Sequence, residues 1–247
     1  MKLTVVGCGD AFGSGGRLQT SFHVTSGDKT FLIDCGATTL IGMQRLELDP
    51  DAVSTIFISH LHGDHFGGLV WWPLHAHYVS RRTAPLTIVG PKGIEARYVA
   101  ASEALFPNST TAARDFEMSF VEHEPGKPCD YDGITVTAFE VVHPSGAPPY
   151  ALRIACDGKV LGFSGDTKWV DSLLPAANGA DLFISECFTF SEQSGYHMTW
   201  RDIERNIDRL GARRVMLTHM GPDMLEQRSL ITDPRVLLAE DGKVLEV

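Results

Sequence analysis

The stretch Val53-Ser54-Thr55-Ile56-Phe57-Ile58-Ser59, continued at once by His60-Leu61-His62-Gly63-Asp64-His65, decides the fold of this chain. Its first part is apolar and β-branched, which predicts a buried strand. Its second part places three imidazoles and a carboxylate in one turn, a costly arrangement to bury without partners. Imidazole nitrogen and carboxylate oxygen are ligands that zinc and similar divalent ions prefer. The stretch therefore predicts a metal site at the carboxyl end of a strand, where open α/β sheets commonly place their chemistry.

Three later apolar runs end in a residue of the same ligand types. Val141-Val142 leads into His143, Phe163-Ser164-Gly165 into Asp166, and Leu217-Thr218 into His219. Each has a plainer interpretation: His143 can open a turn before Pro144, Asp166 can cap a helix, and His219 can belong to a loop. Together with the turn at His60, they favour one metal centre built from several strand ends.

Composition sets the class of protein. The chain has 247 residues and a net charge of −10, enough for a substantial core but without a general attraction for phosphate backbones. Its apolar runs fall short of the roughly 18 residues of a membrane span, and its start has no signal-peptide pattern. The five cysteines form no CxxC pair, so we expect reduced thiols. These features predict a cytoplasmic protein without a membrane partner.

Strand patterns occur in runs, with helical patterns between some of them. Hairpin signals stand at Ser26-Gly27-Asp28 and Asp157-Gly158. Helical patterns cover residues 38–47, 66–81, 93–106, 170–176 and 199–210, the last with Thr199 as its N-cap. With no domain boundary evident, we expect one domain over residues 1–247. The simplest α/β architecture is two mixed sheets packed face to face with helices outside.

At this point the residues resemble the metallo-β-lactamase superfamily, because residues 60–68 match its HxHxDHxxG signature and three later ligands follow in the right order. The resemblance implies a four-layer αββα sandwich. It implies one metal on His60, His62 and His143, a second on Asp64, His65 and His219, and Asp166 as a bridge. Zinc is the expected ion, with manganese or iron as alternatives, and a hydroxide would bridge the two ions.

Two further segments resemble the ribonuclease Z-like branch. One is the glycine-rich opening of residues 7–21; the other is Glu186 at a strand end, followed by His197 in a His-x-Thr element. The branch usually has His-Glu-Ala-Thr and His-Ser-Thr, so Ser185 and Met198 are departures. The resemblance implies that His197 donates a proton or hydrogen bond to the scissile group and that Glu186 orients it. Asp64 is expected to act both as ligand and as partner of the attacking hydroxide.

The stretch at residues 93–124 is short and acidic, where ribonuclease Z carries a long basic arm that grips tRNA. We therefore expect a dinuclear hydrolase, a phosphodiesterase of small or cyclic phosphodiesters. A lactone or carboxyl-ester hydrolase, with Tyr196 as a candidate residue, tRNA 3′ processing, and a metal-binding accessory protein without turnover stay open as alternatives. Sequence does not fix the physiological substrate.

Two surface features bear on partners. Arg201, Arg205, Arg209 and Arg213 form a basic stripe on one predicted helix, which we interpret as paired with its own acids, as in Arg201–Glu204 and Arg205–Asp208. A nucleic-acid partner is therefore not favoured, although a local basic patch leaves it open. A homodimer is a further alternative, with Trp71-Trp72 either an interface patch or a buried pair.

Overall fold

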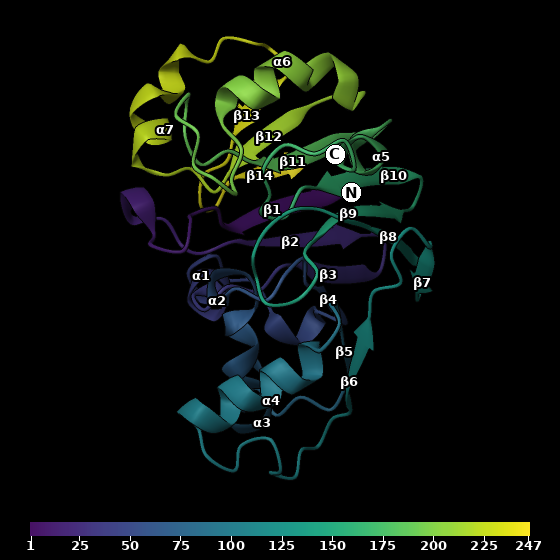
Figure 1. Cartoon of the computed structure of the whole chain (residues 1–247). Helices are drawn as coiled ribbons and strands as arrows, with labels where there is room; N and C mark the ends of the chain where they lie inside the picture. Colours follow the sequence, from purple (N-terminus) through teal and green to yellow (C-terminus); the bar gives the residue numbers. More distant parts are fainter.

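The computed structural model describes residues 1–247 and contains two mixed sheets of seven strands each. Figure 1 shows the sheets in the middle of the molecule, with helices above and below them. This arrangement confirms the predicted α/β architecture of two mixed sheets with outer helices.

The first sheet is built almost entirely from the N-terminal half of the chain. It has the order β14-β1-β2-β3-β4-β5-β6. Its pairings are antiparallel from β14 to β3 and parallel from β3 to β6. The strands are β1 (Lys2–Gly7), β2 (Ser21–Ser26), β3 (Lys29–Ile33), β4 (Thr55–Phe57), β5 (Leu86–Gly90), β6 (Met118–Glu122) and β14 (Val244–Glu246).

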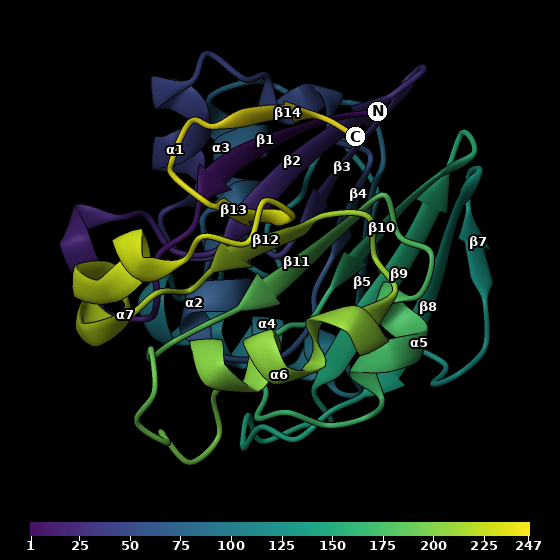
Figure 2. The ribbon, with the colours of Figure 1, turned by 90° about the horizontal axis from the view of Figure 1, so that it is seen from above.

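The second sheet repeats this plan. Its order is β13-β12-β11-β10-β9-β8-β7, antiparallel from β7 to β10 and parallel from β10 to β13. Figure 2 shows these strands side by side. They are β7 (Cys129–Tyr131), β8 (Ile134–Glu140), β9 (Tyr150–Cys156), β10 (Lys159–Phe163), β11 (Leu182–Glu186), β12 (Val215–Thr218) and β13 (Val236–Leu238).

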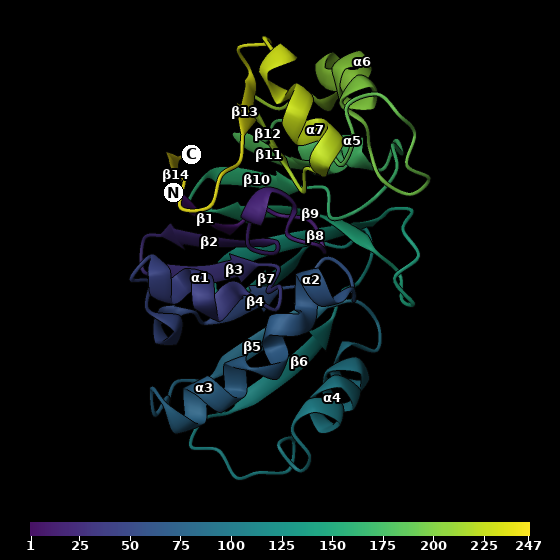
Figure 3. The same ribbon diagram turned by 90° about the vertical axis from the view of Figure 1, so that its left-hand side faces the viewer.

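Helices cover the outer face of each sheet, as the side view in Figure 3 shows. The first sheet carries α1 (Thr39–Arg45), α2 (Gly63–Phe66), α3 (Trp72–Tyr78) and α4 (Ile94–Leu105). The second carries α5 (Leu173–Ala177), α6 (Trp200–Leu210) and α7 (Pro222–Gln227). No helix has the length and hydropathy that crossing a bilayer requires.

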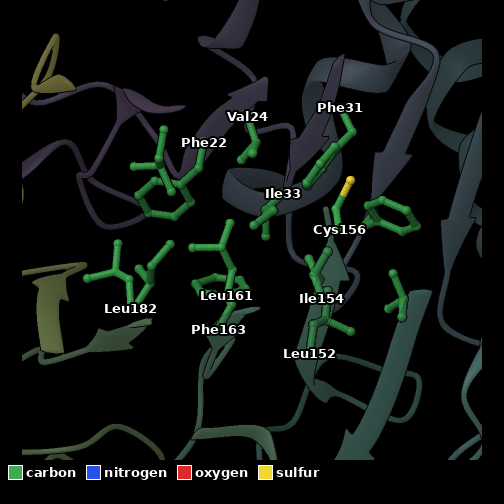
Figure 4. Packing of buried hydrophobic residues seen from close by; sticks show 14 of the residues in the cluster. Phe22, Val24, Phe31, Ile33, Leu152, Ile154, Cys156, Leu161, Phe163 and Leu182 are labelled. Atoms are coloured by element: carbon green, nitrogen blue, oxygen red, sulfur yellow. The ribbon is translucent and has the colours of Figure 1, made fainter. Parts of the chain in front are cut away.

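The core between the sheets follows from the alternation of apolar residues along the strands. Phe22, Phe31 and Ile33 of the first sheet face Leu152 and Phe163 of the second, and all five are buried (Figure 4). The Phe22 and Phe163 rings meet edge to face with centroids 5.7 Å apart. Separate apolar clusters fill the space between each sheet and its helices. The four layers are therefore held by three cores, and the polar residues at the strand ends are left at the rim.

Most predicted elements are confirmed, including both hairpins and the Thr199 N-cap, which forms a capping box with Asp202. The helix expected over residues 66–81 is wrong. The segment instead contains α2, a 3₁₀ turn at Gly67–Val70 and then α3. Adjacent glycines and Pro73 in the first turn of α3 explain the break, because glycine weakens a helix and proline favours its start.

The basic stripe on α6 is paired with acids, as expected, but not with every predicted partner. Arg201 pairs with Glu204 at 2.6 Å. The expected pair of Arg205 with Asp208 is wrong, because Arg235 reaches Asp208 from the segment before β13, at 2.7 Å. Arg209 pairs with Asp171 at 3.0 Å, and Arg213, which lies beyond the end of α6, pairs with Asp181 at 3.2 Å, so the stripe also has partners outside its own helix.

Candidate metal centre

The predicted ligands come from strand ends of both sheets and meet at one rim of the sandwich. His60 follows β4, Asp166 follows β10, and His219 follows β12, while His143 lies in the loop after β8. His219 has a φ of 57°, an uncommon backbone conformation for a residue without glycine's freedom. Such local strain often accompanies functional sites, where surrounding contacts hold it in place.

The His60–His65 turn is held by close contact with the segment after β3. The Cys35 amide donates to the His65 carbonyl at 2.6 Å, and the Gly68 amide donates to the Cys35 carbonyl at 2.8 Å. A Cβ on Gly68 would lie 2.5 Å from the Gly36 carbonyl oxygen, and a Cβ on Gly36 would lie 2.4 Å from that of Asp64. The last glycine of the HxHxDHxxG signature therefore allows the backbone after α2 to touch the segment after β3.

The side chains gather in two adjacent groups. His60, His62 and His143 form the first group, and Asp64, His65, Asp166 and His219 form the second; within each, the ligand atoms lie within 4.8 Å of one another. All but His62 are buried. All seven residues named from the sequence are thus brought together by the fold.

Asp166 lies between the two groups. Its Oδ1 is 3.2 Å from His65 Nε2, and its Oδ2 is 3.3 Å from His219 Nε2. The same Oδ2 is 3.7 Å from His60 Nε2 and 3.8 Å from His143 Nε2. The carboxylate therefore reaches imidazoles of both groups, as a bridging ligand would.

The surroundings shift the pKa values of the imidazoles in opposite directions. Burial lowers the pKa of His60 well below its usual range and that of His143 to about 4. Burial has the same tendency at His219, but the carboxylates of Asp166 and Asp64 outweigh it and raise the pKa of His219 to about 9. The carboxylates likewise hold the pKa of His65 well above its usual range. His60 and His143 of the first group are therefore neutral donors, whereas in the second group the charges of the imidazoles and carboxylates compensate one another.

The donors fit divalent ions. The Nε2 atoms of His60 and His65 and the Oδ1 of Asp166 are buried without a hydrogen-bond partner, which is costly unless another ligand satisfies them. Imidazoles and carboxylates in two adjacent groups suit zinc, manganese or iron. The two predicted ions would be held by these seven residues.

Sequence reasoning missed Asp34, which orients part of this centre. Asp34 is fully buried at the end of β3, with a φ of 57°. It accepts hydrogen bonds from the Ser59 amide at 2.7 Å and hydroxyl at 2.8 Å, and its Oδ2 lies 2.6 Å from His65 Nδ1. Ligating histidines are commonly held in this way by a carboxylate. The signal was an aspartate ending a strictly apolar strand pattern, Phe31-Leu32-Ile33.

Glu186 and His197 form a hydrogen-bonded pair beside the second group. His197 Nδ1 lies 3.0 Å from Glu186 Oε2, and Glu186 also accepts from the Thr167 amide. The His197 ring stacks on His219, with centroids 5.4 Å apart. Burial works to lower the pKa of His197, but the hydrogen bond and charge of Glu186 outweigh this and raise it. Glu186 is buried, which raises the pKa of its carboxyl group.

These groups surround a cavity of about 200 Å³ that contains no lysine or arginine. Its lining comprises Asp10, Ala11, Phe12, His62, Asp64, His143, Asp166, Phe188, His197 and His219. The glycine-rich opening loop forms one wall, and its Asp10 accepts from the amides of Phe12 and Ser14 at 3.2 and 2.8 Å. The loop is also tied to the far end of the chain, since Asp241 accepts from the amides of Cys8 and Leu18 at 3.0 and 2.7 Å.

Two other residues named from the sequence have clear positions. Tyr196 approaches the centre through its main-chain oxygen, 3.2 Å from His143 Nδ1. Trp72 is packed in the core at 1% exposure, whereas Trp71 is 38% exposed. The tryptophan pair is therefore divided between core and surface, and the homodimer stays a prediction.

The fold and this buried histidine and aspartate cluster define a metallo-β-lactamase fold protein with the centre of a metallo-hydrolase. Within this class, the chain belongs to the family described as anti-Pycsar protein Apyc1, whose profile matches residues 1–245.

Similar proteins span the whole chain. YhfI of Bacillus subtilis, a metallo-β-lactamase fold protein, is 24% identical over the full length of both chains, and its crystal structure superposes with a TM-score of 0.79. Ribonuclease Z of Mycobacterium bovis is 27% identical, covering 92% of this chain and 90% of its own. Human tRNase Z, short form, has a TM-score of 0.80 at 24% identity and covers 100% of this chain and 99% of its own. The resemblance to the ribonuclease Z-like branch is confirmed.

Proposed function

We propose that the protein is a dinuclear metal-dependent phosphodiesterase that hydrolyses small or cyclic phosphodiesters. The observation that carries the proposal is the Glu186–His197 pair, which lies at the cavity beside Asp166 and His219. An imidazole held by a buried carboxylate beside such a centre has the arrangement of a proton donor to a leaving oxygen.

The two ions, when bound, supply Lewis acidity toward a phosphoryl oxygen and lower the pKa of water. The residues of the chain provide the rest. His197 Nδ1 is occupied by Glu186, so its Nε2 is the atom available to a substrate in the cavity. Because Glu186 raises the pKa of His197, the ring carries its proton at higher pH than a free imidazole and can donate it to the departing oxygen.

Asp64 serves first as a ligand in this proposal. Its Oδ2 lies 3.2 Å from His219 Nε2, and the neighbouring imidazoles hold the pKa of its carboxyl well below the usual range, despite burial. A carboxylate of such low basicity accepts a hydrogen bond more readily than a proton. Its second role, as partner of the attacking oxygen, is accordingly one of orientation.

The substrate is expected to be small. The cavity at the centre measures about 200 Å³, and none of its lining residues is a cation that could hold further phosphates of a polynucleotide. The net charge of −10 also opposes RNA binding. These features favour a single phosphodiester over the tRNA that the names of the ribonuclease Z relatives imply for those proteins.

The test is hydrolysis by the zinc- or manganese-loaded protein. We expect turnover of bis-p-nitrophenyl phosphate and of 2′,3′- or 3′,5′-cyclic nucleotides, and little turnover of p-nitrophenyl acetate or simple lactones. Ester or lactone turnover without phosphodiester turnover would select the alternative hydrolase. Cleavage of pre-tRNA alone would select 3′ processing, and stoichiometric metal without any turnover would select an accessory protein.

The Glu186→Gln variant tests the role given to the pair. Removing the carboxylate lowers the pKa of His197, so the alkaline decline of kcat should begin at lower pH, with kcat reduced by about tenfold or more. A pH profile of kcat measures both effects. Glu192→Gln is the matched control, because Glu192 is exposed in the loop between β11 and α6 that also carries His197. An unchanged profile for Glu186→Gln would remove the proton-donor role from His197.

A further inference from the structure

A third group of possible metal ligands overlaps the second one. Glu186 and His197 lie with Asp166 and His219 in a set whose ligand atoms are all within 4.8 Å of one another. Asp166 and His219 also belong to the second group, whereas Glu186 and His197 belong to this set alone. The pair to which we assign proton donation therefore lies where a further ion could be held.

The donors of this third group suit the same metals as the other two groups. It offers two imidazoles and two carboxylates, which are ligands of zinc, manganese and iron. Asp166 Oδ1 and His219 Nδ1 are buried without a hydrogen-bond partner, so the group contains polar atoms that the protein leaves unsatisfied. His197, the member of the group that is not fully buried, lines the metal cavity. An ion in the cavity can therefore reach this group.

The cavity lining attracts cations and holds none of its own. Its charged side chains include the carboxylates of Asp10, Asp64 and Asp166, and no lysine or arginine is among them. The repulsion that opposes a further ion therefore comes from the two ions of the first and second groups, which are close to it. This repulsion favours binding only at metal concentrations above those that fill the other two groups.

Shared ligands also make the third group weaker than the second. An ion of the second group takes Asp166 and His219, and it has His65 in addition, whose Nδ1 lies 2.6 Å from Asp34 Oδ2. This leaves Glu186 and His197 as ligands of the third group alone, fewer than the three protein ligands usual for catalytic zinc. The third group is thus expected to fill last.

We propose that the third group is an inhibitory metal position, which an excess of the activating ion fills by taking Glu186 and His197 as ligands. The ion replaces the hydrogen bond of 3.0 Å between His197 Nδ1 and Glu186 Oε2, and the protonated ring releases one proton to solvent. The N–H that remains on the ring belongs to a neutral imidazole, a far weaker acid than the protonated one. Binding of the ion is independent of the proposed function, whereas the loss of turnover rests on it.

The binding test counts ions in matched variants. Zinc is titrated into the metal-free protein, and calorimetry with elemental analysis after equilibrium dialysis gives the number of ions and their affinities. The wild-type protein should bind a third ion more weakly than the first two. Glu186→Gln keeps an acceptor for the Thr167 amide, and thermal unfolding checks that the fold is kept.

Glu186→Gln should retain the first two ions and weaken the third by at least about tenfold, since even partners outside the ligand set are worth about 10- to 100-fold in affinity. Glu192→Gln, exposed in the loop between β11 and α6, should bind all three ions as wild type does. A wild-type protein without a third ion, or a third ion that Glu186→Gln leaves unchanged, would overturn the proposal.

The turnover test uses two substrates that differ in their need for a proton donor. p-Nitrophenolate leaves bis-p-nitrophenyl phosphate without a proton, whereas the alkoxide that leaves from adenosine 3′,5′-cyclic monophosphate needs one. Excess zinc should therefore reduce kcat for the cyclic nucleotide by about a hundredfold, and kcat for the aryl diester clearly less. The residual kcat of Glu186→Gln should be nearly insensitive to excess zinc.

Two outcomes separate the inhibitory position from the proposed function. Equal inhibition of both substrates, or of wild type and Glu186→Gln, would overturn inhibition through His197 and leave the phosphodiesterase in place. Absence of any phosphodiester hydrolysis would contradict the proposed function, and the count of bound ions would still decide whether the third position exists.

Discussion

The two ligand groups of the centre are both rich in histidine, yet their surroundings shift the imidazole pKa values in opposite directions. In the first group, burial lowers the pKa values of His60 and His143, and the nitrogens are neutral donors. In the second, carboxylates surround His65 and His219 and raise their pKa values in spite of burial. Burial is common to both groups, so the carboxylates supply the difference. An ion entering the second group must therefore displace protons, whereas one entering the first displaces few.

The largest expected effect comes from removing the residue that joins the groups. Asp166→Ala should reduce the proposed phosphodiesterase activity by about a thousandfold or more, because a bound ion contributes several kcal/mol of charge stabilisation. Metal content should fall from two ions to one or none, while the circular dichroism spectrum is kept. Asp181→Ala, at a carboxylate paired with Arg213 away from the centre, is the control. Full activity in Asp166→Ala would contradict the prediction that Asp166 is a ligand shared by both ions.

The pH dependence of metal binding tests the comparison directly. Below a pKa of about 9 for His219, and with His65 also raised, each of the two rings carries a proton that the ion must displace. Affinity for the second ion should therefore fall by up to about a hundredfold per pH unit as the pH decreases from about 8 to about 6. The first ion should show a clearly smaller slope. Competition with a chromophoric chelator measures both affinities, and equal slopes would contradict the assignment of charge to one group.

Asp34→Asn sharpens the comparison from outside the ligand set. Asp34 contacts His65 directly, so its loss should weaken the second ion by about 10- to 100-fold. The first ion should be affected less, because Asp34 reaches His60 only through Ser59, whose hydroxyl lies 3.1 Å from His60 Nδ1. The same chelator competition applies. Asp28→Asn, at an exposed hairpin position, is the control. An equal loss of affinity for both ions would mean that Asp34 stabilises both ligand groups and not His65 in particular.

The smallest effect concerns His123, a buried imidazole without a carboxylate at its side. Burial lowers the pKa of His123 to about 4, and its Nε2 donates to the Ile58 carbonyl at 3.1 Å. The unfolded chain then binds more protons between about pH 6.5 and pH 4, so His123 should cost about 2 kcal/mol of stability on going from pH 7.5 to pH 5. His123→Leu should remove this part of the loss, measured by urea unfolding at both pH values. An unaltered pH dependence would show that burial alone does not lower an imidazole pKa here.

Much of the centre was predictable because its residues follow strand patterns in the sequence. His143, Asp166 and His219 each end an apolar run, and parallel or adjacent strands bring such ends to one rim. Hairpins at Gly27 and Gly158 were predictable from short-range turn chemistry. These features depend on local sequence, so they can be predicted without knowing how the two sheets pack together.

Other features depend on contacts between distant segments. Asp34 ends an apolar run as the ligands do, but its contact with His65 Nδ1 depends on β3 lying beside β4. The division of Trp71 from Trp72 follows from how this segment packs on the sheet, which leaves Trp71 38% exposed and Trp72 1% exposed. Strands β13 and β14 are only three residues long, too short for a periodic signal.

The contact of Asp241 with the opening loop has a consequence for biosynthesis. A ribosome releases β1 and the loop after it long before residue 241, and the outer edge of β1 has no partner until β14 emerges. The carboxylate that holds the amides of Cys8 and Leu18 arrives at the same late moment. The contact that holds one wall of the metal cavity therefore forms only after β13 has emerged, so a nascent chain that already carries all seven predicted ligands still lacks it.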